Sequence, residues 1–126
     1  MPFVSGGAEL VTVGWCLGHF VDECAATWRN EIGLALDEAW RVRKPGGQFV
    51  VIETLSTGQL APAPPTPGLA EYYDWLGYER GLACSCLRTD YQFSTARDAA
   101  DTLGFFFGEA LSERVLARDW ARVPEW

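Results

Sequence analysis

Residues 40–53 constrain the fold more than any other part of the chain. A helical pattern runs into Lys-Pro-Gly-Gly at residues 44–47, and an apolar run, Phe-Val-Val-Ile, follows at once at residues 49–52. Proline cannot continue a helix, and glycine tolerates the positive φ angles of a sharp reversal. A short, continuous, β-branched run is typical of a strand in a parallel sheet. The segment therefore predicts a helix, a turn and a strand of a doubly wound α/β fold.

A second strand is predicted at residues 9–13, ahead of a glycine-bracketed loop at residues 14–21. Between the two strands, with Asp22 or Thr27 as the candidate cap, apolar side chains recur at helical spacing: Trp28, Ile32, Ala35, Leu36, Ala39, Trp40 and Val42. If the strands are parallel neighbours, the loops that follow them meet at the carboxyl edge of the sheet. Open α/β sheets bind ligands at that edge, so we expect a site built from residues 14–20 and 53–58.

The rest of the chain is predicted to form shorter elements. Four of the seven prolines fall at residues 62–67, which indicates a stiff connector over residues 59–68. A helix is expected at residues 69–76 and a strand at residues 87–93. Thr95 is expected to open a helix that buries Ala96, Ala99, Ala100 and Leu103. After a break at residues 104–108, a last helix is expected at residues 109–118, with Leu111, Val115 and Leu116 on its buried side. The length of 126 residues predicts one domain, with residues 1–8 as a disordered or leader segment.

Composition and charge argue against several classes of function. The net charge is −7, and Lys44 is the single lysine beside nine arginines, so we expect no binding to nucleic acid. No long apolar run or signal-peptide pattern occurs, which predicts a cytoplasmic protein that is not embedded in a membrane. The four cysteines do not have the spacing of a zinc site and are expected to be free thiols.

Residues 10–53 resemble the second half of a class I S-adenosylmethionine-dependent methyltransferase domain of the type 11/12-like group. The family pattern is a strand reading roughly Phe-Asp-Leu-Val, a short apolar loop, and a helix ending Arg-Val-Leu-Lys-Pro-Gly-Gly before another strand. The matching pieces here are residues 8–11 (Ala-Glu-Leu-Val), 14–20, 41–47 (Arg-Val-Arg-Lys-Pro-Gly-Gly) and 49–52. The resemblance implies a partial Rossmann-like sheet, with central strands at about residues 9–13 and 48–53 and helices packed on it.

The resemblance also implies site residues, because the loop at residues 14–22 is similar to that of ubiquinone- and menaquinone-type methyltransferases. The residues expected to contact the cofactor, S-adenosyl-L-methionine, are Gly14, Trp15 and Leu17. His19 is the candidate catalytic base, since imidazole titrates near neutral pH. The residues expected to bind the small-molecule methyl acceptor are Glu53, Tyr72 and Tyr73. The alternatives are a turn glycine, core packing of the apolar residues and a loop-capping glutamate.

The chain departs from the family in one major respect. Family members carry a glycine-rich loop after their first strand, and no segment before residue 9 matches it. We therefore expect a fragment that binds the cofactor weakly or not at all, with an exposed strand edge that promotes self-association. One alternative is a non-catalytic α/β module completed by a partner chain. A nicotinamide-dependent oxidoreductase is a weaker alternative, because no dinucleotide fingerprint occurs.

Overall fold

The computed structural model describes residues 2–126, and their contacts group into two compact units. The first unit comprises the described residues up to Glu53 together with Thr66–Arg80, and the second comprises Thr54–Pro65 and Gly81–Trp126. The chain therefore passes from one unit to the other after Glu53, after Pro65 and after Arg80. The sequence had predicted one domain with a connector at residues 59–68, whereas the contacts put most of that connector in the second unit.

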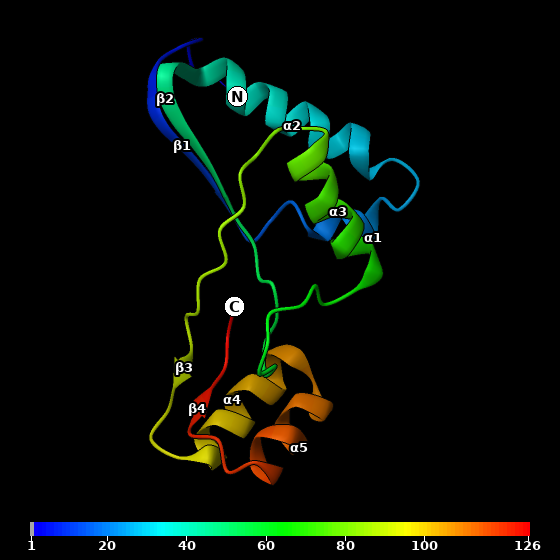
Figure 1. The fold of residues 1–126 in the computed structure, drawn as a ribbon, viewed down its shortest axis with the longest axis vertical. Helices are drawn as coiled ribbons and strands as arrows, with labels where there is room; N and C mark the ends of the chain where they lie inside the picture. Colours follow the sequence, from blue (N-terminus) through cyan, green and yellow to red (C-terminus); the bar gives the residue numbers. More distant parts are fainter. Residues whose placement is uncertain (1) are drawn as a thin grey trace. The chain divides into compact units, whose positions relative to one another are not determined.

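The first unit is a small parallel sheet with helices (Figure 1). Strand β1 (Ala8–Gly14) pairs in parallel with β2 (Arg43–Ile52), and α2 (Trp28–Val42) connects them after the short helix α1 (His19–Glu23). Helix α3 (Pro67–Tyr78) returns to this unit and contacts α1. The predicted strand–helix–strand order is confirmed, and the observed architecture is a mixed α/β unit with a two-stranded parallel sheet. Helix α1 begins within the segment predicted to be a loop, residues 14–21, and extends two residues beyond it.

Helix α2 packs an apolar stripe against the sheet and its neighbours. Its buried residues are Trp28, Ile32, Gly33, Leu36, Ala39 and Val42. Near the end of the helix, the ring of Trp40 lies 4.9 Å from that of Phe49 on β2, centroid to centroid. The prediction that Ala35 faces inward is wrong, because Ala35 lies on the exposed side and Gly33 takes the buried position.

The Lys-Pro-Gly-Gly motif forms a bulge at the start of β2. Ala8 pairs with Arg43 and Leu10 pairs with Gln48, so four residues of β2 stand opposite one residue of β1. Gly46 has a φ of +77°, in the left-handed region that glycine tolerates. A Cβ on Gly47 would lie only 2.8 Å from the carbonyl oxygen of Glu9, so a side chain there would collide with the backbone of β1. The motif thus brings the end of α2 directly into register with β1.

The two faces of this sheet differ. Val11, Val13, Phe49 and Val51 are half-buried. On the alternate positions Leu10, Val50 and Ile52 are 55%, 39% and 41% exposed. The sheet therefore presents an apolar face to solvent, and among residues 2–126 each of its two strands pairs with the other alone.

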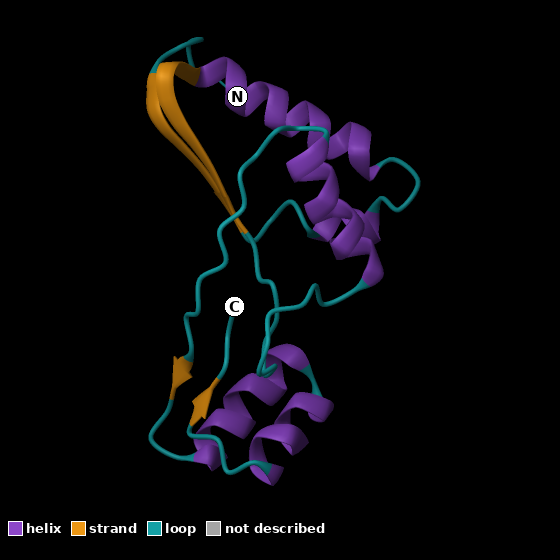
Figure 2. Cartoon of the chain, viewed as in Figure 1, coloured by secondary structure: helices purple, strands orange, loops and turns teal. Residues whose placement is uncertain are grey.

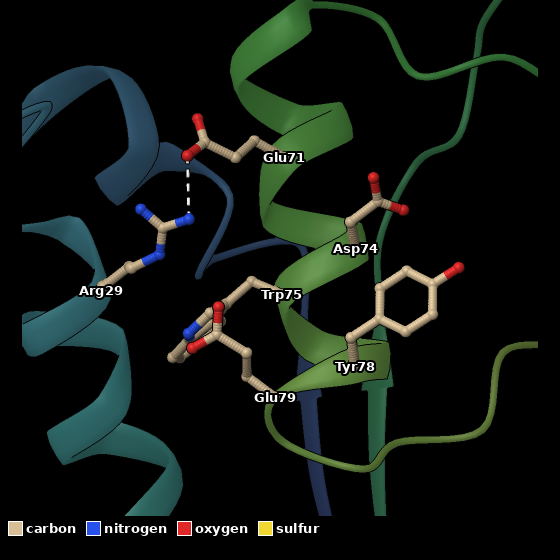
Figure 3. Close-up of a pocket in the computed structure, with 6 residues that line it drawn as sticks. All are labelled: Arg29, Glu71, Asp74, Trp75, Tyr78 and Glu79. Atoms are coloured by element: carbon tan, nitrogen blue, oxygen red, sulfur yellow. Dashed lines mark hydrogen bonds and ion pairs between the residues drawn. The ribbon is translucent and has the colours of Figure 1, made fainter.

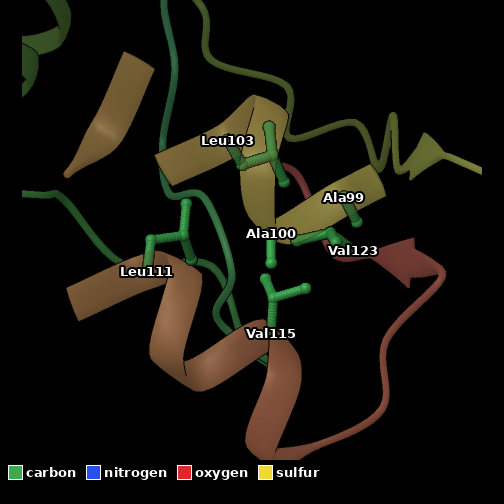
Figure 4. Close-up of a cluster of buried hydrophobic side chains, with 6 residues drawn as sticks. All are labelled: Ala99, Ala100, Leu103, Leu111, Val115 and Val123. Carbon is green, nitrogen blue, oxygen red and sulfur yellow. The ribbon is translucent and has the colours of Figure 1, made fainter. Parts of the chain in front are cut away.

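The second unit pairs two helices with a short antiparallel ladder (Figure 2). Its elements are β3 (Tyr91–Gln92), α4 (Ala96–Phe107), α5 (Glu109–Ala117) and β4 (Arg122–Val123). The core between α4, α5 and β4 consists of Ala99, Ala100, Leu103, Leu111, Val115 and Val123 (Figure 4). A Cβ on Gly104 would lie 2.9 Å from Cβ of Ser112, so glycine permits the close packing of α4 on α5.

The predicted elements of this unit are confirmed in part. Thr95 caps α4 as expected, accepting a hydrogen bond from the Asp98 amide at 3.0 Å. The predicted break at residues 104–108 is Gly108 alone, which has a φ of +91°. Of the predicted strand at residues 87–93, only β3 forms. Leu87 is 71% exposed, so the period-two pattern there lacks a core to bury it. Leu116, expected to be buried in α5, is 44% exposed.

Within residues 2–126, no helix combines the length and the apolar character needed to cross a membrane.

Candidate active site at the end of strand β2

The Glu53 carboxylate is the centre of the candidate site. Glu53 directly follows β2, at the carboxyl edge of the two parallel strands. Its Oε1 atom accepts hydrogen bonds from the Gly18 amide and from the Tyr72 hydroxyl, each at 3.2 Å. The carboxylate therefore joins the loop after β1 to helix α3, through residues that lie 35 and 19 positions away.

The loop after β1 approaches β2 closely. The Trp15 amide donates to the Ile52 carbonyl at 2.9 Å, and Trp15 has a φ of +51°, which costs a non-glycine residue about 1–2 kcal/mol. At Gly18, an added Cβ would lie 3.2 Å from Leu69 Cδ2 and 3.4 Å from Glu53 Oε2. The absence of a side chain at Gly18 thus lets its amide reach Glu53.

Helix α3 supplies the tyrosines. It begins with Thr66, whose hydroxyl accepts from the Leu69 amide at 3.1 Å, and with Pro67 in its first turn. Tyr72 is fully buried, and its ring packs edge to face on Trp28 with centroids 5.9 Å apart. Tyr73 is half-buried beside it, with ring centroids 5.4 Å apart. The packing of α3 on α2 therefore fixes the Tyr72 hydroxyl against Glu53.

Burial and neighbouring charge shift the titration of this group of side chains. Burial raises the pKa of Glu53 above 4.5, against the opposing effect of the hydrogen bonds from Gly18 and Tyr72 and of the nearby His19. Burial, together with the Glu53 charge, raises the pKa of Tyr72 strongly and that of Tyr73 to about 12. The same two causes raise the pKa of the Cys16 thiol. Both phenols therefore stay protonated at physiological pH and can donate hydrogen bonds.

The predicted cofactor residues lie at the end of β1 and on the loop that contacts this carboxylate, but they differ in environment. Gly14 ends β1 opposite Ile52 and is exposed, with space for a Cβ. The Trp15 ring is 63% exposed, whereas Leu17 is 5% exposed and belongs to the core. His19 is exposed and begins α1. The structure thus gathers Glu53, Tyr72, Tyr73 and His19 into one electrostatic group, while the core position of Leu17 matches the packing alternative.

Two residues of the site were not singled out from the sequence. Gly18 donates the amide that holds Glu53, and Cys16 lies close enough for its thiol to feel the Glu53 charge. The signal for Gly18 was the second glycine of the loop, since a glycine allows close backbone approach to a partner. Comparison of the chain with family models, with curated proteins and with solved structures found no match.

S-adenosyl-L-methionine is the cofactor that the resemblance of residues 10–53 implies, and the residues present would suit only one end of it. Gly14 offers exposed backbone at the carboxyl end of β1, where a ligand can approach closely. Within the described residues we find no glycine-rich loop after a strand that would hold the rest of such a cofactor. The described residues would therefore suit only the methionine end of such a cofactor, where Gly14 ends β1 and Trp15 follows it.

A separate hollow lies on another side of α3 (Figure 3). It has a volume of about 330 Å³, is open to solvent, and is lined by Arg29, Glu71, Asp74, Trp75, Tyr78 and Glu79. Arg29 pairs with Glu71 at 2.8 Å across it, and both side chains are about half exposed. Because water already solvates these charges, the hollow offers little to a ligand compared with the half-buried carboxylate.

Metal-binding side chains are dispersed. Among residues 2–126, no three or more His, Cys, Asp or Glu side chains group in a way that could hold a metal ion. The four cysteines are free, and Cys16, Cys84 and Cys86 are exposed. The side chains gathered at the candidate site supply a carboxyl group, two phenols, a thiol and an imidazole.

Proposed function

We propose that this chain is part of an S-adenosyl-L-methionine-dependent methyltransferase and carries the side of the site that holds a small-molecule methyl acceptor. The observation that supports the proposal best is the Glu53 carboxylate, held at the carboxyl edge of two parallel strands by Gly18 and Tyr72. Ligands of open α/β sheets bind at this edge. The resemblance of residues 10–53 to the family supplies the reaction class.

Each residue has a distinct task in this proposal. Gly14 and Trp15 provide backbone and ring surface for the methionine end of the cofactor, which supplies an electrophilic methyl group when bound. Glu53 hydrogen-bonds the acceptor and orients it, and Tyr72 keeps the carboxylate in place. Tyr73 adds an aromatic wall. Methyl transfer depends mainly on orientation in a dry pocket, and these are contributions that fixed side chains make.

A second candidate is a non-catalytic α/β module completed by a partner chain. The exposed apolar sheet face favours it, since Leu10 is 55% exposed and each strand has one partner within the described residues. An apolar face with free strand edges is ready to pair with further strands. The two candidates are compatible if the partner brings the glycine-rich loop. In that case, a protein that carries this loop would copurify with the chain.

The test of the methyltransferase proposal is cofactor binding measured residue by residue. The 126-residue chain, labelled with ¹⁵N, is titrated with S-adenosyl-L-methionine and, as a control, with ATP, which shares the adenosine but lacks the methionine. We expect weak, millimolar binding that shifts the amides of Gly14, Trp15 and Gly18 with the first ligand only. Equal shifts with both ligands, or no shift at these amides, would contradict the proposal.

A further inference from the structure

The acceptor capacity of the Glu53 carboxylate is unevenly used. The Gly18 amide and the Tyr72 hydroxyl both donate to Oε1. An oxygen of a carboxylate has two lone pairs, so these two donors use Oε1 fully. The backbone of Leu17 also hydrogen-bonds the carboxylate. The capacity that remains for a ligand therefore lies on Oε2, which has two lone pairs.

The groups around this carboxylate favour a cationic partner. The titratable groups facing Glu53 are Cys16 from the loop, His19 from α1, and Tyr72 and Tyr73 from α3. Four cations of the first unit form their ion pairs elsewhere: Arg29 with Glu71, Arg41 with Glu38, Lys44 with Glu9 and Arg80 with Asp37. Arg43 donates to the Gly47 carbonyl instead. Glu53 has no arginine or lysine ion-pair partner among residues 2–126, so its half-buried charge is compensated by hydrogen bonds and by the nearby His19.

An aromatic ring stands beside the carboxylate. Tyr73 is half-buried, its ring lies 5.4 Å from that of Tyr72, and its phenol is close enough to Glu53 for the two to interact electrostatically. An ammonium group gains both from a carboxylate and from the face of an aromatic ring. An anion would instead be repelled by Glu53.

We propose that the Glu53 site binds a primary amine, and that this amine is the methyl acceptor, an identification that rests on the proposed function. The ammonium nitrogen donates to Glu53 Oε2, and the organic part of the ligand lies against the ring of Tyr73. The acceptor is thus a nitrogen nucleophile, and Glu53 rather than His19 takes its proton.

The proposed transfer conserves charge and atoms. The ammonium group gives one proton to the Glu53 carboxylate, which leaves a neutral amine and a neutral carboxyl group. A bound cofactor would supply the electrophilic methyl carbon: the amine lone pair would form the new carbon–nitrogen bond, and the carbon–sulfur bond would break with its electron pair left on sulfur. The product is a methylated ammonium and a neutral thioether. A carboxyl whose pKa is raised by burial is a better proton acceptor than an exposed one.

The test uses three probes of matched shape and different charge. The ¹⁵N-labelled full chain is titrated near neutral pH with benzylamine, benzyl alcohol and benzoate, and the Gly18 amide is followed because it donates to Glu53. We expect benzylamine to bind at least about tenfold more tightly than benzyl alcohol, a difference of about 1.4 kcal/mol, and benzoate not to bind. Equal binding of the amine and the alcohol would overturn the proposal, and this comparison needs no variant.

Substitutions then locate the site. Glu53→Gln is expected to lower benzylamine affinity about tenfold, whereas Glu53→Asp, which keeps the charge, retains the preference for the amine. Glu71→Gln is the matched control, since it removes the same charge from the exposed side of α3. Benzylamine binding should also strengthen as pH rises through the titration of Glu53. An equal loss of affinity in Glu71→Gln would overturn the assignment to Glu53.

The two proposals fail in different ways. An amine preference without any response of Gly14 and Trp15 to S-adenosyl-L-methionine would support the amine site and contradict the methyltransferase. A response to the cofactor without an amine preference would contradict the amine site alone.

Discussion

The Tyr72 hydroxyl donates a hydrogen bond to Glu53 Oε1 at 3.2 Å, and this contact fastens α3 to the end of β2. The Tyr72 ring is fully buried against Trp28, so its hydroxyl cannot reach bulk water if Glu53 is lost. The ring and the hydroxyl therefore make separable contributions, one to packing and one to the position of the carboxylate.

Removing this hydroxyl should weaken the first unit. Tyr72→Phe keeps the ring packing and loses a hydrogen bond to a charged acceptor, which costs about 1.5–3 kcal/mol. We expect a loss of unfolding free energy in this range near neutral pH in urea titrations, with a smaller loss when Glu53 is protonated. Tyr78→Phe is the control, because Tyr78 is 88% exposed. Similar losses in both variants would show that the Glu53 contact is not the cause.

Ionisation of Glu53 should give stability a defined pH dependence. Its pKa in the folded chain is raised above 4.5, so the folded state binds this proton more tightly than the unfolded state. The resulting stabilisation is fully present below pH 4.5 and is lost as pH rises through the raised pKa. Glu53→Gln should therefore flatten the decline in unfolding free energy over this window, measured in urea at a series of pH values.

Glu125 should contribute to the pH dependence of stability over the same pH range. It is a buried carboxyl of the second unit, with Oε2 unpaired, and burial raises its pKa also. Glu125→Gln should remove a further part of the slope, and the double variant should be the flattest. An unchanged slope in Glu53→Gln would contradict the environment described for this group.

The bulge in β2 should distinguish its two glycines. Gly47→Ala places a Cβ 2.8 Å from a backbone oxygen of β1, and we expect a loss of about 3 kcal/mol. Gly46→Ala meets no atom within 4 Å but requires a φ of +77°, so its loss should be about 1 kcal/mol. Thermal unfolding of the two variants side by side checks the order. The reverse order would mean that the strands are not joined in the described register.

The exposed sheet face should make the chain self-associate. We expect light scattering at micromolar concentration to show species larger than a monomer, because free edges and apolar faces of strands pair readily. Leu10→Lys should reduce the association. Leu34→Lys, which changes an apolar residue 61% exposed on α2, should not. A monodisperse monomer of the unsubstituted chain would contradict the prediction.

The part of the fold that was predicted well depends on strong local signals. The order of β1, α2 and β2 follows from helical periodicity, the proline–glycine pair and β-branched runs, each of which acts over a few residues. Thr95 caps α4 for the same local reason. The predicted strand at residues 87–93 is mostly irregular, because alternation produces a strand only where a partner and a core are available.

The sequence identified residues of the candidate site but not the contacts between them. Glu53 and Tyr72 were both identified, but their hydrogen bond depends on how α3 packs on α2, which involves contacts more than 40 residues apart such as that of Trp28 with Tyr72. The role of Gly18 depends on how closely Leu69 and Glu53 approach it, and a local sequence pattern carries no information on that proximity. The grouping of the contacts into two units likewise follows from tertiary contacts and not from composition.

The path of the chain has a practical consequence for dissecting this protein. Because the chain crosses between the two units after Glu53, Pro65 and Arg80, neither unit is a continuous stretch of sequence. A truncation after Glu53 would take α3, and with it Tyr72, away from the carboxylate it holds. Separate expression of either unit would require a redesigned connection, such as a short linker from Glu53 to Thr66. In contrast, dividing the chain within residues 59–64 and coexpressing the two pieces would leave every hydrogen bond around Glu53 available.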